Sequence, residues 1–311
     1  MRRAAGFAVL GFVLGGCALG PDYERPELDV PENYIQSIDQ GESFANVPWW
    51  EVFEDPQLEA LIRVALEENQ DIRIAVARIE EFRGLLGVTR ADQFPQVDIT
   101  GSGVRNEPSE NSFPGNLPTL GDQIAETYQL SADVFFELDL FGRLRRSTES
   151  ARAQLLAIEE NRRAVTISLV AAVASTYMTL RDLDQQLEIA RRTETTRAHS
   201  LGIIEARFEK GTVARIDVNQ AEIQLTIAEA AVASAERQVA QTENQLNILL
   251  GRKPGAILRG LPLRQQAFPP TIPTGLPAEL LQRRPDVRAS EADLASQTAL
   301  IGVAEALRWP T

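Results

Sequence analysis

Residues 218–249 read VNQAEIQLTIAEAAVASAERQVAQTENQLNIL, and this stretch decides the fold. Two series of apolar or small residues recur in it every seven positions. They are Val218, Leu225, Val232, Val239 and Leu246, and Ala221, Ala228, Ala235, Thr242 and Leu249. An a/d pattern kept over five heptads predicts a helix that packs on another helix in a left-handed coil. The small residues of the second series would allow a close approach.

The segment before this stretch is expected to form the partner helix. Residues 144–210 contain no proline and a single glycine, Gly202, so we expect one helix over residues 141–210. At 1.5 Å per residue this helix would be roughly 100 Å long. Its apolar positions include Leu169, Val173, Leu180, Leu183, Leu187, Ala190, Leu201, Ile204 and Phe208. Gly211 is expected to form the turn between the helices and Gly251 to end the second one. Taken alone, this hairpin also fits a plain coiled-coil rod.

Two segments upstream alternate with a period of two, which argues against the rod. Residues 96–104 alternate polar residues with apolar or small ones. In a second run one face carries Tyr128, Leu130, Ala132, Val134, Phe136 and Leu138, and the other carries Thr127, Gln129, Ser131, Asp133, Phe135, Glu137 and Asp139. Such strands suit a transmembrane β-barrel with a wet lumen, although a soluble hairpin has the same pattern. Since two strands cannot close a barrel in lipid, further strands must come from elsewhere in the chain or from other subunits.

The sequence nearly repeats itself at an offset of 215 residues. Asp71, Arg73, Ala77, Leu85, Gly87, Val88, Ala91 and Pro95 meet Asp286, Arg288, Ala292, Leu300, Gly302, Val303, Ala306 and Pro310, and Phe94 meets Trp309. The second copy reaches only the start of its first strand. Completing it predicts a protein of roughly 465 residues, so we expect a fragment, a frameshift product or an incomplete reading frame.

The N-terminus has the pattern of an export signal. Two arginines precede an apolar run, residues 4–14, that is too short to span a bilayer. The run ends in Leu14-Gly15-Gly16-Cys17, which resembles the lipobox of bacterial lipoproteins. We expect Cys17 to become the lipidated first residue, and the alternative is an ordinary signal peptide with a chance cysteine. Ala18 at the next position, where retained lipoproteins carry Asp, favours sorting to the outer membrane.

The composition excludes several classes of function. The net charge of −13 leaves no basic surface that would neutralise the phosphates of a nucleic acid. One cysteine excludes an internal disulfide, and one histidine excludes a histidine-rich metal site. His199 lies in a long helical segment and cannot join a Ser/His/Asp or Cys/His set. We therefore expect neither an enzyme nor a cofactor, apart from the covalent lipid on Cys17.

Several short motifs follow one another along the chain. After Cys17 they are Gly20-Pro21-Asp22-Tyr23-Glu24-Arg25-Pro26, then Trp49-Trp50, Phe53, Asp55-Pro56 and Leu58, then Glu137-Leu138-Asp139-Leu140-Phe141-Gly142-Arg143, then Arg207-Phe208-Glu209-Lys210-Gly211 with Ile216-Asp217-Val218, and last Leu280-Leu281-Gln282-Arg283-Arg284-Pro285-Asp286-Val287. Each motif is weak alone. In this order, and joined to the internal repeat, they make the whole chain from the lipobox onward resemble the TolC-like outer membrane factor family, in its lipoprotein branch.

The resemblance implies a mainly α fold with a small β part. A long coiled helical hairpin would form part of an α-barrel, and a β-hairpin would contribute to the transmembrane β-barrel of a homotrimer. It implies the outer-membrane channel of a tripartite efflux system that exports small molecules. The partners would be a periplasmic adaptor, an inner-membrane pump of the resistance-nodulation-division type and outer-membrane lipid. The protein would be lipid-anchored in the outer membrane of a Gram-negative bacterium, with its helices in the periplasm.

The same resemblance assigns the functional residues. The turn Lys210-Gly211-Thr212-Val213 would lie at the periplasmic tip and meet the adaptor, although a tight turn between helices needs a glycine in any case. Asp217 matches a position that helps to hold the closed tip in relatives, through contacts with a second hairpin that these residues do not include. The alternative for Asp217 is a solvated carboxylate favoured by the helix dipole.

The expected organisation has seven segments. Residues 1–16 form the signal peptide, 17–50 a lipidated extended arm, 51–94 the equatorial and upper helices of the first repeat, 95–140 the outer-membrane β-hairpin, 141–251 the long periplasmic hairpin, 252–276 a linker, and 277–311 the start of the second repeat. Two other interpretations stay open: a non-functional truncated remnant of such a lipoprotein, and a periplasmic adaptor protein. An adaptor would flank its helical hairpin with strand-rich domains. We expect the isolated chain to aggregate through its unpaired strands and exposed heptad faces.

Overall fold

The computed structural model describes residues 18–31, 50, 53–106, 125–266 and 281–310. The predicted signal peptide and Cys17 lie outside these described residues, as does most of the segment 32–52. The chain divides into two compact units. The first unit comprises Met1–Arg25, Glu81–Leu156 and Ala292–Thr311, and the second comprises Pro26–Glu80 and Ala157–Glu291.

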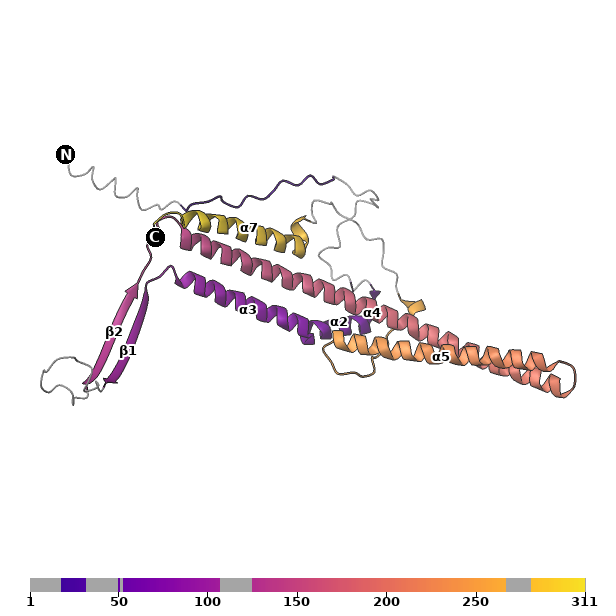
Figure 1. Ribbon diagram of the computed structural model, residues 1–311. Coiled ribbons are helices and arrows are strands. Elements are labelled where there is room, and N and C mark those ends of the chain that lie inside the picture. Colours follow the sequence, from indigo (N-terminus) through magenta and orange to yellow (C-terminus); the bar gives the residue numbers. More distant parts are fainter. Residues whose placement is uncertain (1–17, 32–49, 51–52, 107–124, 267–280, 311) are drawn as a thin grey trace, which may run out of the picture. The chain divides into compact units, whose positions relative to one another are not determined.

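The described part of the chain is mainly helical (Figure 1). Its helices are α2 (Pro56–Glu68), α3 (Gln70–Ala91), α4 (Arg143–Glu209), α5 (Arg215–Leu249) and α7 (Pro285–Ala306), with the short 3-10 turn η3 (Leu263–Gln265). With 67 residues, α4 is about 100 Å long. The long helix predicted over residues 141–210 is therefore confirmed, with bounds that differ by at most two residues.

In the second unit α5 lies alongside the later part of α4 (Figure 1). All ten predicted heptad positions of α5 are buried or half-buried, whereas most other residues of this helix are exposed. An ion pair between Arg191 of α4 and Glu236 of α5, 2.7 Å apart, adds a link between the two helices. One predicted apolar position is wrong: Phe208, near the end of α4, is 36% exposed. Its ring lies under the guanidinium of Arg215, 5.6 Å from the ring centroid.

The core of the second unit forms where α2 joins this helical hairpin. Buried residues from α2, α4 and α5 make one cluster, which includes Leu58, Leu61, Ile62, Leu169, Val173, Tyr177, Leu180, Leu246 and Leu250. Burying a leucine or valine side chain contributes roughly 1.5–3 kcal/mol. Among the described residues α4 is the one helix long and apolar enough to cross a membrane by length and composition. Core residues of α4 such as Leu169, Val173 and Leu180 contribute to that apolar character.

One residue joins three helices at the edge of this core. Asn69 ends α2 and is 3% exposed. Its side-chain oxygen accepts the N–H groups of Asp71 (2.8 Å) and Ile72 (3.2 Å), which caps the start of α3. Its side-chain N–H donates to the carbonyl of Leu249 (2.9 Å) at the end of α5. One amide group therefore satisfies helix ends that lie 180 residues apart in the sequence.

The first unit contains a two-stranded antiparallel sheet, β1 (Gln96–Asn106) and β2 (Ala125–Phe135). The register pairs Val97 with Val134 and Ile99 with Ala132 on one face. On the other face it pairs Asp98 with Asp133, Thr100 with Ser131, and Ser102 with Gln129. The predicted two-faced hairpin is therefore confirmed, although the segment 107–124 that joins the strands lies outside the described residues.

The predicted end of the second strand is wrong. The alternation continues to Asp139, but β2 ends at Phe135. Beyond this point two carboxylates bind the start of α4 instead of continuing the strand. Glu137 accepts two hydrogen bonds from the guanidinium of Arg143 (2.9 and 2.5 Å). Asp139 accepts the backbone N–H groups of Leu144 (3.2 Å) and Arg145 (3.0 Å).

The internal repeat is visible in the helices. Both α3 and α7 have 22 residues, and each bound of α7 lies 215 residues after the matching bound of α3. The turns that follow also match: the N–H of Phe94 donates to the carbonyl of Ala91 (2.9 Å), and that of Trp309 to the carbonyl of Ala306 (3.0 Å). The same sequence pattern therefore builds the same local structure twice.

Candidate functional site at the helical hairpin and its tip

The turn between α4 and α5 has a defined geometry. The N–H of Gly211 donates to the carbonyl of Phe208 (2.9 Å), and that of Thr212 to the carbonyl of Arg207 (3.0 Å). This pair of bonds is a Schellman motif, which requires the left-handed backbone that Gly211 adopts with φ +72°. The hydroxyl of Thr212 donates to the same carbonyl of Arg207 (2.9 Å). The predicted glycine turn is confirmed, and it is held by three hydrogen bonds.

Three of the four residues of the turn are exposed. Lys210 and Thr212 are exposed, whereas Val213 is half-buried. No atom lies within 4 Å of the position that a Cβ on Gly211 would take. The turn is therefore an ordered loop with a free outer surface in this chain.

Asp217 lies in the first turn of α5, three residues after Ala214 at the N-cap. Its carboxylate accepts the N–H of Ala214 (3.0 Å), which is the acidic half of a capping box. This contact gives Asp217 a local structural role. The same residue lines a groove of about 240 Å³ together with Arg197, Ser200, Ile204, Gln220, Ala221 and Gln224. The groove runs between α4 and α5 near the turn, so Asp217 both caps α5 and lines this groove.

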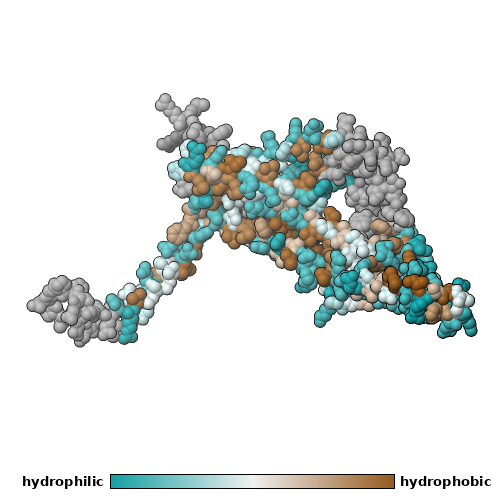
Figure 2. Space-filling view, turned by 45° about the vertical axis from the view of Figure 1, so that its right-hand side comes forward, coloured by the Kyte–Doolittle hydropathy of each residue, from teal (hydrophilic) through white to brown (hydrophobic). Residues whose placement is uncertain are grey.

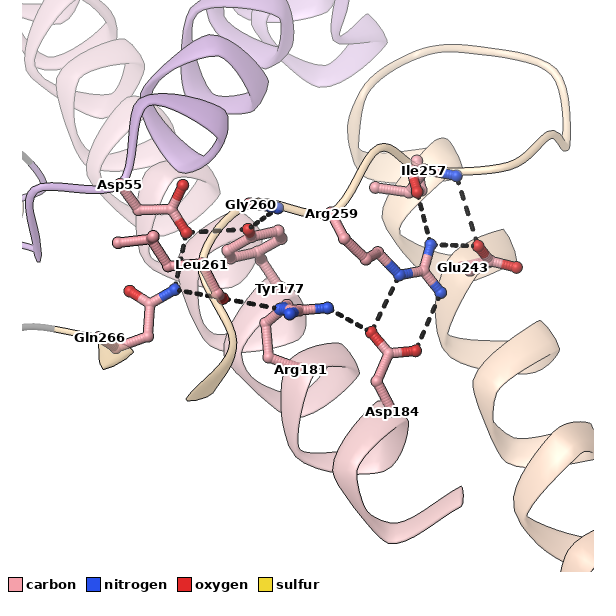
Figure 3. A network of polar contacts seen from close by, with 10 residues as sticks. All are labelled: Asp55, Tyr177, Arg181, Asp184, Glu243, Ile257, Arg259, Gly260, Leu261 and Gln266. Atoms are coloured by element: carbon pink, nitrogen blue, oxygen red, sulfur yellow. Dashed lines mark hydrogen bonds and ion pairs between the residues drawn. The ribbon is translucent and has the colours of Figure 1, made fainter. Parts of the chain in front are cut away.

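At the other end of the hairpin, a network of polar side chains holds the segment that follows α5 (Figure 3). The hydroxyl of Tyr177 donates to the carboxylate of Asp55 (2.9 Å) and accepts the N–H of Gly260 (3.0 Å). Gln266 donates to the same carboxylate oxygen (2.7 Å). A Cβ at position 260 would collide with both Asp55 and the Tyr177 hydroxyl, so this approach requires a glycine.

The network continues through two arginines, of which Arg259 binds both helices of the hairpin and Arg181 binds α4 to the segment after α5. Arg259 donates to both oxygens of Asp184 on α4 (2.9 and 3.1 Å) and to Glu243 on α5. Arg181 donates to the carbonyl of Leu261 (3.1 Å) and to Asp184 (2.6 Å). Figure 3 shows these groups side by side at the base of the hairpin. The network therefore fixes α4, α5 and the following segment to one another.

The network shifts the pKa values of its members. Burial raises the pKa of Tyr177 to about 12, and its hydrogen bond to Asp55 acts in the same direction. Burial alone would raise the pKa of Asp55, but the hydrogen bonds that it accepts from Gln266, Tyr177 and the helix N-terminus lower it overall. Asp55 is therefore an ionised N-cap of α2 that accepts hydrogen bonds from Gln266, Tyr177 and the first turn of the helix.

One face of the strand pair in the first unit is apolar and exposed. Among the most exposed residues are Val97, Ile99, Tyr128, Leu130 and Val134, each 61–80% exposed. Figure 2 shows hydrophobic residues on the outer surface among polar ones. In the described residues, β1 and β2 pair only with each other, so each strand has one open edge. An exposed apolar face beside open strand edges needs lipid or further strands to cover it.

The structure thus places Lys210, Gly211, Thr212, Val213 and Asp217 together at one end of the hairpin, while Cys17 lies outside the described residues. His199 is exposed on α4. In the described part of the chain, no group of three or more His, Cys, Asp or Glu residues is placed to hold a metal ion.

The sequence did not predict the network at the base of the hairpin. The Asp-Pro pair at residues 55–56 is a recognisable helix-start pattern, with an N-cap followed by proline at the first helical position. That signal could have identified Asp55. No local pattern links Tyr177 to Gly260, which is 83 residues away.

Comparisons with known proteins agree on one family. The family described as "Outer membrane efflux protein" matches residues 61–252. The chain is 38% identical over 313 residues to the solvent efflux pump outer membrane protein SrpC of Pseudomonas putida, and 33% identical over 309 residues to the cation efflux system protein CusC of Escherichia coli. These matches cover 98% and 97% of this chain but 65% of each relative, so the chain spans about two thirds of their length.

Solved structures give the same result. The open state of the outer membrane channel MtrE of Neisseria gonorrhoeae superimposes with a TM-score of 0.78 at 31% sequence identity, and the match covers 94% of this chain and 64% of that one. The outer-membrane channel OprN gives a TM-score of 0.76 at 31% identity, covering 93% of this chain and 64% of that one.

Proposed function

Because the chain belongs to the outer membrane efflux protein family, we propose that it acts as the outer-membrane channel subunit of a tripartite efflux system. The observation that carries the proposal is the pairing of two elements in one chain. A strand pair with an exposed apolar face suits the bilayer, and a helix of about 100 Å suits the space beneath it. The family consists of efflux channels rather than enzymes.

The proposed assembly is a homotrimer. Two strands with open edges cannot stand alone in lipid, because each unpaired backbone group there costs several kcal/mol. The strand pairs of three copies, together with the strands expected of the second repeat, would close into a barrel with the Asp98 and Asp133 face toward a wet lumen and the Ile99 and Leu130 face toward lipid. On α5, Ile216, Ile223 and Ile227 lie off the heptad positions and are 58–68% exposed, which leaves a second apolar surface for a neighbouring helix.

The proposed location is the outer membrane of a Gram-negative bacterium, and the relatives from Pseudomonas putida are named as outer membrane proteins. The lipobox-like motif before Cys17 supports a lipid anchor on that residue. The helices would then extend into the periplasm.

The proposed partners are a periplasmic adaptor and an inner-membrane pump of the resistance-nodulation-division type. The adaptor would dock at the tip formed by Lys210, Gly211, Thr212 and Val213, whose exposed and ordered geometry supports this role. Asp217 would contribute to holding the tip closed, from its place in the groove between α4 and α5. The relatives are named for solvents, toluene and cations, which supports small molecules as the exported class.

The test is whether the protein forms a conducting trimer. The outer-membrane fraction of an expressing Gram-negative cell would be extracted in mild detergent, resolved with and without heating, and reconstituted in planar bilayers. We expect a band that only boiling converts to monomer, and stepwise conductance. A protein that stays monomeric in every detergent and conducts no ions would refute the channel.

A further inference from the structure

Two of the sequence motifs meet in the first unit, although about 120 residues separate them. The stretch Ala18-Leu19-Gly20-Pro21-Asp22 starts the described part of the N-terminal arm, and Glu137 to Arg143 form the corner between β2 and α4. The N–H of Leu19 donates to the carbonyl of Phe141 (3.0 Å). Figure 1 shows the arm passing the start of α4 and the end of α7.

Where the arm crosses the corner and α7, the backbones lie too close together for side chains at three positions. Gly142, with φ +82°, lies against Ala18, and a Cβ there would come within 2.6 Å of the Ala18 Cα. Gly20, with φ +89°, lies against the backbone of Gly302 on α7, where a Cβ on either glycine would collide. Gly20, Gly142 and Gly302 come from three distant parts of the sequence. Because they have no side chains, the arm can pack closely against the start of α4 and against α7.

Arg146 fastens the arm at this crossing. Its side chain is 6% exposed and lies one turn into α4. The guanidinium donates to the carbonyls of Leu19 (3.0 Å) and Gly20 (3.1 Å) and to the carboxylate of Asp22 (2.8 Å), and its remaining amino group donates to Glu149 (2.8 Å). Only arginine has a planar fork of donors that can serve these acceptors at once.

The corner that receives the arm is itself held firmly. Glu137 and Asp139 bind the first turn of α4 as described above, so the place where the strands end is fixed relative to Arg146. The ring of Phe141 stacks on Trp309, with ring centroids 5.3 Å apart. The arm is therefore attached to the point where the strand pair passes into the helices.

We infer that Arg146 is a positioning residue that latches the N-terminal arm to the strand-to-helix corner, so that a lipid carried just before Ala18 enters the bilayer beside the strands. This inference rests on the proposed membrane-inserted strands and lipid anchor. Its partner is the lipid bilayer. A latched arm keeps the strands at high effective concentration next to the membrane, whereas a free arm would hold them only by a flexible tether.

The test compares the full-length protein, wild type and Arg146→Ala, extracted from outer membranes. Hydrogen exchange at the amide of Leu19, which donates to the carbonyl of Phe141, reports the latch, and far-UV circular dichroism reports the helices. We expect exchange at this amide to rise by about tenfold, because several hydrogen bonds from a charged donor are lost. Arg146→Lys should give a smaller rise, since one ammonium cannot serve every acceptor. Arg152→Ala, an exposed arginine on the same helix, is the matched control and should change nothing.

The second readout is the fraction of heat-resistant trimer at equal lipidation, which intact mass measures. We expect it to fall several-fold in Arg146→Ala. Unchanged exchange at Leu19 with intact helices would overturn the latch. A released arm with a wild-type trimer fraction would overturn its coupling to strand insertion. A wild-type protein that forms no trimer would refute the channel instead, and the exchange result would still decide the latch.

If Arg146→Ala does not fold, a second variant that changes only the arm, Asp22→Ala, still tests the latch. The side chain of Asp22 is 87% exposed, so Asp22→Ala leaves the helices undisturbed. We expect faster exchange at Leu19 in this variant too. Equal exchange in Asp22→Ala and wild type would count against the latch.

Discussion

Replacing Tyr177 with phenylalanine tests the network at the base of the hairpin. Tyr177 is 0% exposed, and its hydroxyl both donates to ionised Asp55 (2.9 Å) and accepts the N–H of Gly260 (3.0 Å). Losing the bond to a charged acceptor costs about 1.5–3 kcal/mol, and leaving the half-buried N–H of Gly260 without its acceptor costs about 1 kcal/mol more. Asp55 keeps its bonds from Gln266 and from the start of α2. We therefore expect Tyr177→Phe to lower the free energy of unfolding by about 2–4 kcal/mol.

The assay is urea denaturation of the purified protein in detergent, followed by circular dichroism, with hydrogen exchange at Gly260 as the local readout. Tyr128→Phe is the matched control, because its hydroxyl donates to Glu126 (3.2 Å) at a site that is 80% exposed. The control should change the free energy of unfolding by less than about 0.5 kcal/mol. A loss below about 1 kcal/mol in Tyr177→Phe, with unchanged exchange at Gly260, would refute the view that this hydroxyl holds the segment after α5.

Three further predictions concern the helix ends and the pH response. Asn69→Ala removes the cap of α3 and the donor to the end of α5, and we expect a loss of about 1–3 kcal/mol in the free energy of unfolding by urea denaturation. Gly211→Ala places a side chain on a left-handed backbone without any clash, so it should lower the melting temperature through a cost of about 1–2 kcal/mol. Because the folded pKa of Asp55 lies below its usual value of about 4, its contribution to stability is present above that pH and is lost as the pH falls through the folded pKa. The pKa of Tyr177 is raised to about 12, so its contribution is complete below pH about 10 and is lost as the pH rises through 12; a pH series of unfolding free energies would check both limits.

The parts of the fold that follow from periodicity were predictable. A seven-residue repeat fixes which face of α5 is apolar, and that face is the one the structure buries. Gly211 and Gly251 both adopt positive φ at the ends of helices, as their places after apolar runs predicted. These features depend on residues that are close together in the sequence, so local patterns are enough to predict them.

Features that depend on distant partners were not predictable from local pattern. The alternation of polar and apolar residues predicts that β2 continues to Asp139. The strand ends earlier because Glu137 and Asp139 bind the start of α4, and an alternating pattern gives no sign of such contacts. Arg146 looks like any helical arginine until the arm lies across it. The motifs around Gly20 and Gly142 could be recognised from the family resemblance. That the two segments pack against each other follows only from the structure.

The internal repeat shows most directly how the surroundings decide the role of a residue. Gly87 of α3 and Gly302 of α7 occupy the same position of two matching helices. A Cβ on Gly87 would meet nothing within 4 Å, whereas a Cβ on Gly302 would lie 2.5 Å from the Leu19 carbonyl oxygen and 2.9 Å from the side chain of Arg146.

Alanine at the two positions should therefore act with opposite signs. Gly87→Ala should stabilise the protein by about 0.5–1 kcal/mol, because alanine restricts the unfolded chain and favours the helix. Gly302→Ala gains the same propensity but must displace the arm or Arg146, and overpacking of this kind costs about 1–3 kcal/mol. Thermal melts of both variants would measure the difference. If both raised the melting temperature equally, the arm would not lie against α7, and the close crossing at Gly20 would be wrong. Since propensity is common to both sites, the difference in sign isolates the contact that the arm makes.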